Sequence, residues 1–127
     1  MVIWAALCVG VATFFAISFA VEVKPDSGLL QPILAAAAVL AIGCIAGSRL
    51  WPARIKQAAG ATPEQMALTR HIVGCALCEG AALFAVVAIL LTRSPYAIAI
   101  AAICFYALLT LYPSLERWNR LARLGEP

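Results

Sequence analysis

Residues 72 to 91 read IVGCALCEGAALFAVVAILL, and Glu79 is the only charged residue among them. At ~1.5 Å per residue, a helix of this length crosses a hydrocarbon core of ~30 Å. A charged side chain at the centre of that core costs at least about 2.5 kcal/mol. We therefore expect Glu79 to face protein or water, to hold a partner, or to stay protonated.

The rest of the chain is also strongly apolar. Of its 127 residues, 65% are hydrophobic and 12% are charged, against ~25% charged residues in soluble domains. Four apolar segments lie at residues 2–21, 29–48, 72–91 and 96–112. They leave no room for a soluble catalytic domain. The pattern predicts one all-α domain over residues 1–127, with four transmembrane helices in two antiparallel hairpins and a short amphipathic tail at residues 114–124.

Basic residues are distributed unequally between the two ends of these segments. Lys24 and Arg93 fall on one side, and the other seven fall on the opposite side: Arg49, Arg54, Lys56, Arg70, Arg117, Arg120 and Arg123. By the positive-inside rule, both termini and the loop between the second and third segments are cytoplasmic. We expect a multi-pass protein of the cell inner (plasma) membrane. Its first segment has no positively charged residues before the apolar run, which favours an uncleaved anchor over a signal peptide.

The third helix is expected to begin well before its apolar span. Thr62-Pro63-Glu64-Gln65 has the pattern of a capping box, with Thr62 at the N-cap and Gln65 able to reach back to it. The segment from Pro63 to His71 would then project about 13 Å into the cytoplasm.

The tail after Pro113 has the pattern of a short amphipathic helix that Ser114 can cap. Arg117, Arg120 and Arg123 fall on one half of this helix and Trp118 falls on the other. We expect these four residues to anchor the tail on an anionic inner leaflet, with docking of another protein as the alternative.

One face of the third helix carries potential ligands. At ~100° per residue, His71, Cys75, Cys78 and Glu79 lie within one half of the helix. Cys8, Cys44 and Cys104 are expected at similar depths in the other helices. Thiols with an imidazole suit a soft metal or a redox reaction, but cysteine also packs as a small hydrophobic residue. His71 is either an interfacial residue or a proton relay toward Glu79.

No pattern typical of an enzyme is present. The sequence has no Ser/His/Asp set, no phosphate-binding loop and no basic-aromatic nucleic-acid patch. We therefore expect no ordinary catalysis, no cofactor, no resident metal and no nucleic-acid partner.

The segment ALCEGAALFAVVAILL, from Ala76 to Leu91, resembles the carboxylate helix of the rotary ATP synthase proteolipid, the c subunit. Ala76, Leu77, Glu79 and Phe84 hold the places of that family's Ala-Leu pair, ion-binding Glu and following aromatic residue. The resemblance implies that Glu79 is a proton or sodium site. The chain as a whole resembles small four-span membrane proteins.

Three functions remain open at this point. The first is a scaffold or accessory subunit of a membrane complex, in which Glu79 is a buried acid hydrogen-bonded across the bundle. Its partners would be the lipid bilayer and other membrane subunits or further copies of itself. The second is proteolipid-like translocation of protons or sodium by Glu79. The third is thiol or metal sensing through the face formed by His71, Cys75 and Cys78. No lysine or arginine is expected at the depth of Glu79, so its candidate partners are Arg49 and Arg70, which would extend toward it from the membrane edge.

Overall fold

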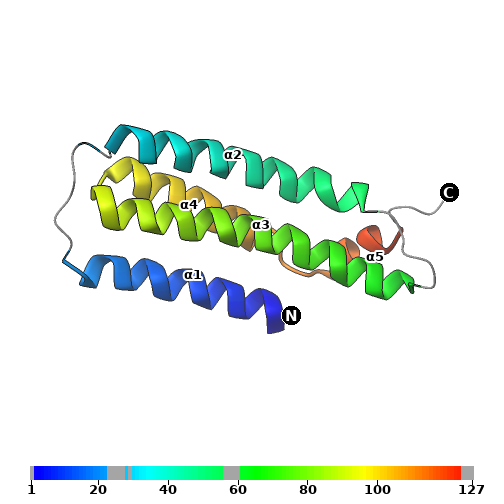
Figure 1. Cartoon of the computed structure of the whole chain (residues 1–127). Coiled ribbons are helices and arrows are strands. Elements are labelled where there is room, and N and C mark those ends of the chain that lie inside the picture. The colour runs from blue at the N-terminus through cyan, green and yellow to red at the C-terminus, as the bar shows by residue number, and fades with distance from the viewer. Residues whose placement is uncertain (1, 23–27, 29, 56–60, 124–127) are drawn as a thin grey trace.

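The computed structural model describes residues 2–22, 28, 30–55 and 61–123 (Figure 1). All regular secondary structure in this part of the chain is helical, which confirms the predicted all-α class. The helices are α1 (Val2–Ala20), α2 (Leu30–Arg54), α3 (Pro63–Thr92), α4 (Pro95–Leu109) and α5 (Leu115–Arg123).

Helix α3 is the central element. It contacts each of the other four helices, and α1 and α2 lie on opposite sides of it (Figure 1). The two helices of the first predicted hairpin run antiparallel but are therefore separated by α3. Four small buried residues within one half of α3, Ala81, Ala82, Ala85 and Ala88, allow its neighbours to approach closely.

The beginning of α3 confirms the capping prediction. The Thr62 hydroxyl accepts a hydrogen bond from the Gln65 backbone N–H at 3.3 Å. The Thr62 backbone N–H donates in return to the Gln65 side-chain oxygen at 3.0 Å. Together with Pro63 at the first helical position, these bonds satisfy the groups that a helix start leaves unpaired.

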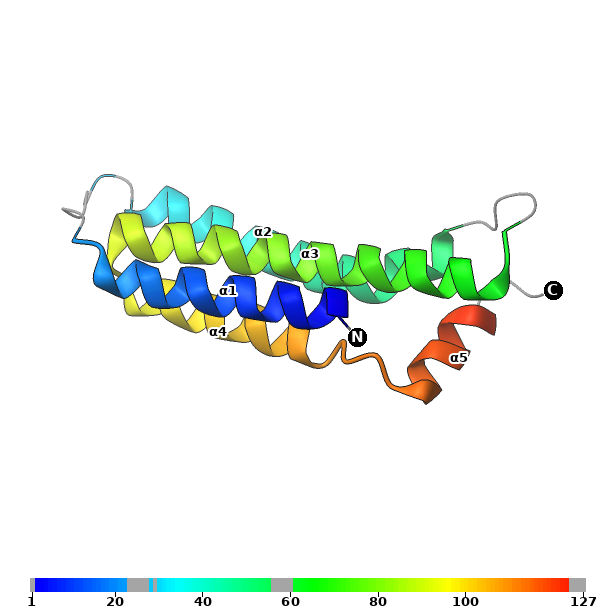
Figure 2. The ribbon, with the colours of Figure 1, turned by 90° about the horizontal axis from the view of Figure 1, so that it is seen from below.

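A tight turn makes α3 and α4 antiparallel neighbours, as predicted (Figure 2). Arg93 has the left-handed conformation, with φ of 51°, and its N–H donates to the Ile89 carbonyl. The Ser94 hydroxyl then caps α4 by accepting from the Tyr96 N–H. The Arg93 guanidinium donates to the carbonyls of Ser18 and Val21, which attaches the end of α1 to this turn.

Three helices are long and apolar enough to cross a membrane: α1, residues Leu30–Pro52 of α2, and α3. Helix α4 has 15 residues, about 22 Å in length, and ends at Leu109 instead of the predicted residue 112. The Thr110 hydroxyl bonds the Ala107 carbonyl, and Pro113 disfavours helical geometry at the residue before it. The fourth span therefore stays a prediction.

Helix α5 packs against the beginning of α3 (Figure 2). Leu121 of α5 is buried there, and so are Met66, Ala67 and Arg70 of α3. The segment that was expected to project into the cytoplasm is thus covered on one side by the tail of the chain. The reason is that α5 offers an apolar face to α3, which a local reading of the sequence assigned to the lipid.

Candidate functional site

Glu79 lies near the middle of α3, at the edge of that helix's buried face. Cys78 before it is buried, Gly80 after it is exposed, and Glu79 itself is partly buried. Its carboxyl group makes no hydrogen bond or ion pair with any residue that the structure describes. The central carboxylate of the apolar span is therefore unpartnered within the described chain.

The two arginines that were considered as partners of Glu79 are bonded elsewhere. Arg49 donates from Nη2 to the Thr110 hydroxyl at 2.7 Å. Arg70 donates from Nη1 to the Leu121 carbonyl at 2.6 Å and from Nη2 to the Ile55 carbonyl at 3.0 Å. Neither guanidinium extends toward Glu79, because the fold provides nearer acceptors at the ends of α4 and α5.

His71, Cys75 and Cys78 are all buried on α3, whereas Glu79, the fourth residue of the face predicted from helix geometry, is only partly buried. The His71 Nε2 atom lies 3.7 Å from the Cys75 sulfur. On its other side, the His71 ring meets Trp118 of α5 edge to face, with 6.4 Å between ring centroids. His71 therefore contacts Cys75 and Trp118, and a relay from His71 to Glu79 has no direct contact to use.

The structure brings all five cysteines into one apolar cluster. Cys8, Cys75, Cys78 and Cys104 are buried in it, and Cys44 packs against it from α2. All five thiols are free. Among the described residues, no group of three or more His, Cys, Asp or Glu side chains is arranged to hold a metal ion. The arrangement is that of thiols filling narrow spaces between helices.

Two of the four residues expected to anchor the tail are turned at least partly toward the protein. Trp118 is half-buried against His71, and Arg117 donates from Nη1 to the Thr110 carbonyl at 3.3 Å. Arg120 is exposed. Arg123 belongs to α5, but its side chain lies outside the described residues. Anchoring of the tail to lipid stays a prediction.

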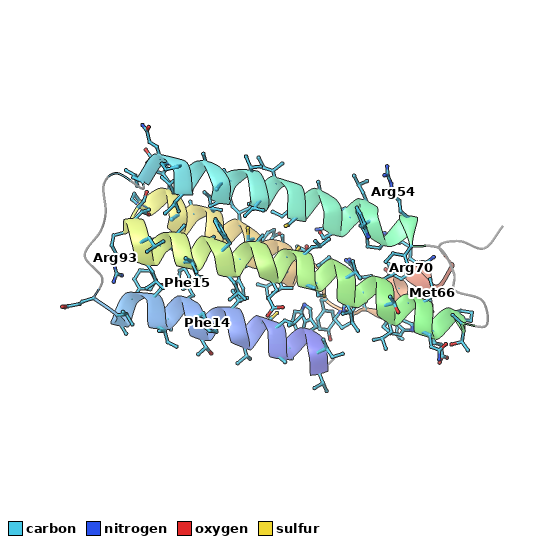
Figure 3. All side chains as sticks on the ribbon, viewed as in Figure 1. Phe14, Phe15, Arg54, Met66, Arg70 and Arg93 are labelled. Carbon is cyan, nitrogen blue, oxygen red and sulfur yellow. The ribbon has the colours of Figure 1, made fainter. Side chains whose placement is uncertain are left out.

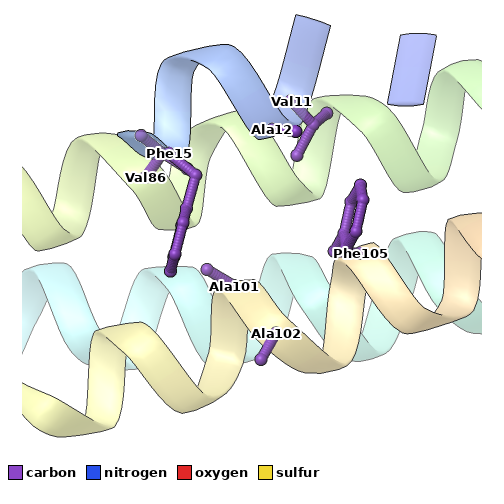
Figure 4. A pocket seen from close by; sticks show the side chains of 7 residues that line it. All are labelled: Val11, Ala12, Phe15, Val86, Ala101, Ala102 and Phe105. Carbon is purple, nitrogen blue, oxygen red and sulfur yellow. The ribbon is translucent and has the colours of Figure 1, made fainter. Parts of the chain in front are cut away.

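An apolar cavity of about 220 Å³ lies between α1, α3 and α4. Figure 4 shows Phe15 of α1 and Phe105 of α4 extending into the space between the helices from opposite sides. Its lining residues are Val11, Ala12, Phe15, Val86, Ala101, Ala102 and Phe105. The cavity offers no polar group for chemistry and suits only an apolar occupant.

Sequence reasoning missed a second, polar cavity. It lies between the end of α2 and α5, and Arg49, Arg117 and Arg120 all line it. The spacing of Arg117 and Arg120 already indicated that both lie on one side of a helix. No local signal indicated that Arg49, from the end of another helix, would join them.

Comparisons with sequence models of protein families, with curated proteins and with solved structures found no match to this chain. The resemblance of its carboxylate helix to the ATP synthase c subunit therefore stays a prediction.

Proposed function

We propose that this chain is a small scaffold or accessory subunit of a membrane complex, in which Glu79 meets a polar group of a partner inside the bilayer. The observation that carries the proposal is the lack of any hydrogen bond or ion pair to Glu79 in the described chain. A buried polar group left unpaired costs about 1–3 kcal/mol. A partner subunit or a second copy that supplies one hydrogen bond removes that cost.

Glu79 points away from the closest helix contact of α3. At ~100° per residue, it lies about 140° around the helix from Gly74. Gly74 faces α2, because a Cβ atom added there would lie 3.4 Å from the Ser48 carbonyl oxygen. The carboxyl group is thus on the side of α3 that faces α1, about 20° around the helix from Val86, which lines a cavity with residues of α1. It is only partly covered there.

The outer surface of α2 supports association within the membrane. Five exposed residues recur on one side of this helix: Ala36, Val39, Gly43, Ala46 and Leu50. A Cβ atom added at Gly43 would meet no other atom within 4 Å. Small residues let helices of different subunits approach closely when lipid provides no hydrophobic drive between them.

Translocation of protons or sodium by Glu79 is the alternative. It draws on the same unpartnered carboxyl and on the resemblance to the c subunit. In that function Glu79 must alternate between charged and neutral states, whereas a scaffold needs only its capacity for hydrogen bonding. Thiol sensing has less support, because Cys75 and Cys78 are 1% and 0% exposed.

The substitutions Glu79→Gln and Glu79→Leu test the scaffold proposal. Complexes are extracted from the expressing cell's membranes in mild detergent and separated by native electrophoresis. We expect Glu79→Gln to keep the assembly, because an amide and a neutral acid both form hydrogen bonds. Glu79→Leu should lower the assembled fraction about threefold to tenfold. Gly80→Leu, at an exposed neighbouring position, is the matched control.

Reconstitution into liposomes with an internal pH-sensitive or sodium-sensitive dye separates the two functions. The scaffold proposal predicts that the purified chain leaves an imposed gradient intact. Dissipation of the gradient by the wild type, lost in Glu79→Gln with assembly unchanged, would establish translocation and refute the scaffold proposal. Equal assembly of wild type and Glu79→Leu would refute a bonding role of Glu79.

A further inference from the structure

A cavity of about 150 Å³ opens between the end of α2 and α5. Its lining residues are Ser48, Arg49, Pro52, Arg117, Arg120 and Leu121. Three of these six residues are arginines, and none is acidic. A polar cavity with this lining concentrates positive charge in a small space.

Contacts to the end of α4 position two of the guanidinium groups. Arg49 of α2 donates to the Thr110 hydroxyl at 2.7 Å, and Arg117 of α5 donates to the Thr110 carbonyl at 3.3 Å. Thr110 thus holds arginines from two helices side by side. Because each guanidinium has five N–H groups in a fixed plane, donors remain for a further acceptor.

One of these donors is buried without a partner. The Nε atom of Arg117 is shielded from solvent and has no hydrogen-bond acceptor among the described residues. Arg120 makes no hydrogen bond or ion pair with any described residue. Buried polar groups are usually paired, so an unpaired donor beside a cavity indicates a missing acceptor.

The charges around the cavity are not neutralised by the described chain. Glu116 is the nearest acid in sequence, but it is exposed and forms no ion pair within the described residues. Burial lowers the pKa of the Arg117 guanidinium from its ordinary value, and the charges of Arg49 and Arg120 lower it further. Since arginine stays protonated in proteins, this repulsion persists at neutral pH, and an anion would relieve it.

The cavity lies where the apolar part of α2 ends. The span that is apolar enough to cross a membrane reaches Pro52, so Ser48 and Arg49 lie in its last turns. Trp51, which lies in sequence between the lining residues Arg49 and Pro52, is exposed. Basic pockets between helices at such a level bind the head groups of anionic lipids.

We propose that Arg49, Arg117 and Arg120 bind a phosphate group in this cavity and that an anionic phospholipid of the adjoining leaflet supplies it. Arginine suits this ligand because its planar N–H groups match phosphate oxygens in pairs. The site is independent of Glu79 and holds whether or not the scaffold proposal does.

The first test is native mass spectrometry of the detergent-purified chain with equal amounts of phosphatidylglycerol and phosphatidylcholine. We expect the wild type to retain the anionic lipid preferentially. Arg120→Gln should lower this preference about fivefold, the effect of one arginine near an anionic surface. Arg54→Gln is the matched control, because Arg54 is exposed at the same end of α2 and does not line the cavity.

Equal preference in Arg120→Gln and Arg54→Gln would overturn the proposal, because it would show attraction by overall charge alone. Arg120→Gln removes no hydrogen bond between residues that the structure describes. Circular dichroism checks that the helix content of the variant is unchanged. Arg117→Lys is the second variant. It keeps the charge but loses the planar donors, so we expect it to weaken lipid retention as well.

Inorganic phosphate distinguishes the two sources of the ligand. If the phosphate comes from lipid, millimolar inorganic phosphate leaves the melting temperature in detergent unchanged, whereas phosphatidylglycerol raises it in the wild type more than in Arg120→Gln. A rise with inorganic phosphate that depends on Arg120, with none for phosphatidylglycerol, would overturn the lipid source and establish a site for free phosphate.

Discussion

Arg70 is a charged side chain that the fold buries almost completely, with 2% of its surface exposed. Its two terminal nitrogens donate to carbonyls on different segments, Leu121 of α5 and Ile55 after α2. A guanidinium can donate to both carbonyls at once because its N–H groups are on separate nitrogens of one plane. This residue therefore fastens α2, α3 and α5 together at one end of the molecule, where Figure 3 also shows Arg54.

Replacing Arg70 with lysine should loosen α5 while keeping the charge. A lysine ammonium cannot bridge both carbonyls, and a hydrogen bond to a charged group contributes about 1.5–3 kcal/mol. We expect the amides of α5 to exchange hydrogen about tenfold faster or more, measured by mass spectrometry in detergent. Arg54→Lys, at an exposed position, should leave exchange unchanged. Unaltered exchange in Arg70→Lys would show that apolar packing alone holds α5.

At the scale of elements, glycines lie at the contact between α2 and α3, where the two helices approach each other closely. Pro52 has no N–H, so the Ser48 carbonyl lacks its usual helical bond. This carbonyl lies beside Gly74, where an added Cβ atom would be 3.4 Å from its oxygen. A Cβ atom added at Gly47 would lie 3.4 Å from the Leu77 side chain. Both glycines thus lie against the facing helix, Gly74 against the backbone of α2 and Gly47 against a side chain of α3.

Gly74→Leu should separate α2 from α3. Its side chain would have to displace the backbone of α2, and overpacking of this kind costs about 1–3 kcal/mol. We expect a lower melting temperature in detergent, followed by circular dichroism. Gly80→Leu is the control on the same helix, because a Cβ atom added at Gly80 meets nothing within 4 Å. Equal melting temperatures for the two variants would refute close packing at Gly74.

At the scale of the whole molecule, basic residues are distributed unequally between the two ends of the helices. Arg54 and Arg70 lie at one end, and Arg93 lies at the other (Figure 3). The beginning of α1 and the whole of α5 lie toward the end where α3 begins (Figures 1 and 2). The location of both termini on one side of a membrane stays a prediction.

We predict that an added protease cleaves epitope tags at the two ends of the chain in the same vesicle orientation. In right-side-out vesicles both tags should resist an added protease, and in inside-out vesicles both should be cleaved, since arginine-rich ends stay in the cytoplasm. A tag inserted next to Arg93 should behave oppositely. Cleavage of only one terminal tag would contradict this prediction and indicate that α4 does not cross the membrane. Its 15 residues are fewer than the roughly 20 that a transmembrane helix needs.

The positions of some candidate site residues could be predicted from the sequence, and the positions of others could not. The shared face of His71, Cys75 and Cys78 follows from helix geometry and is found as expected. The burial of Trp118 against His71 was not predicted, because an amphipathic helix suits lipid and protein equally well. The cavity with Arg49 was also missed, since its members come from separate helices.

The sequence by itself determined the helical class, the three long apolar helices and the start of α3. These features depend on interactions within a few residues, such as the reciprocal bonds of Thr62 and Gln65. Only the tertiary structure decided that α3 is the central helix, that five thiols share one cluster, and that Arg49 faces Arg117 and Arg120. All the spans are similarly apolar, so hydropathy cannot rank them. Which surfaces meet is decided by the close fit of small side chains and by carbonyls that remain as acceptors at helix ends.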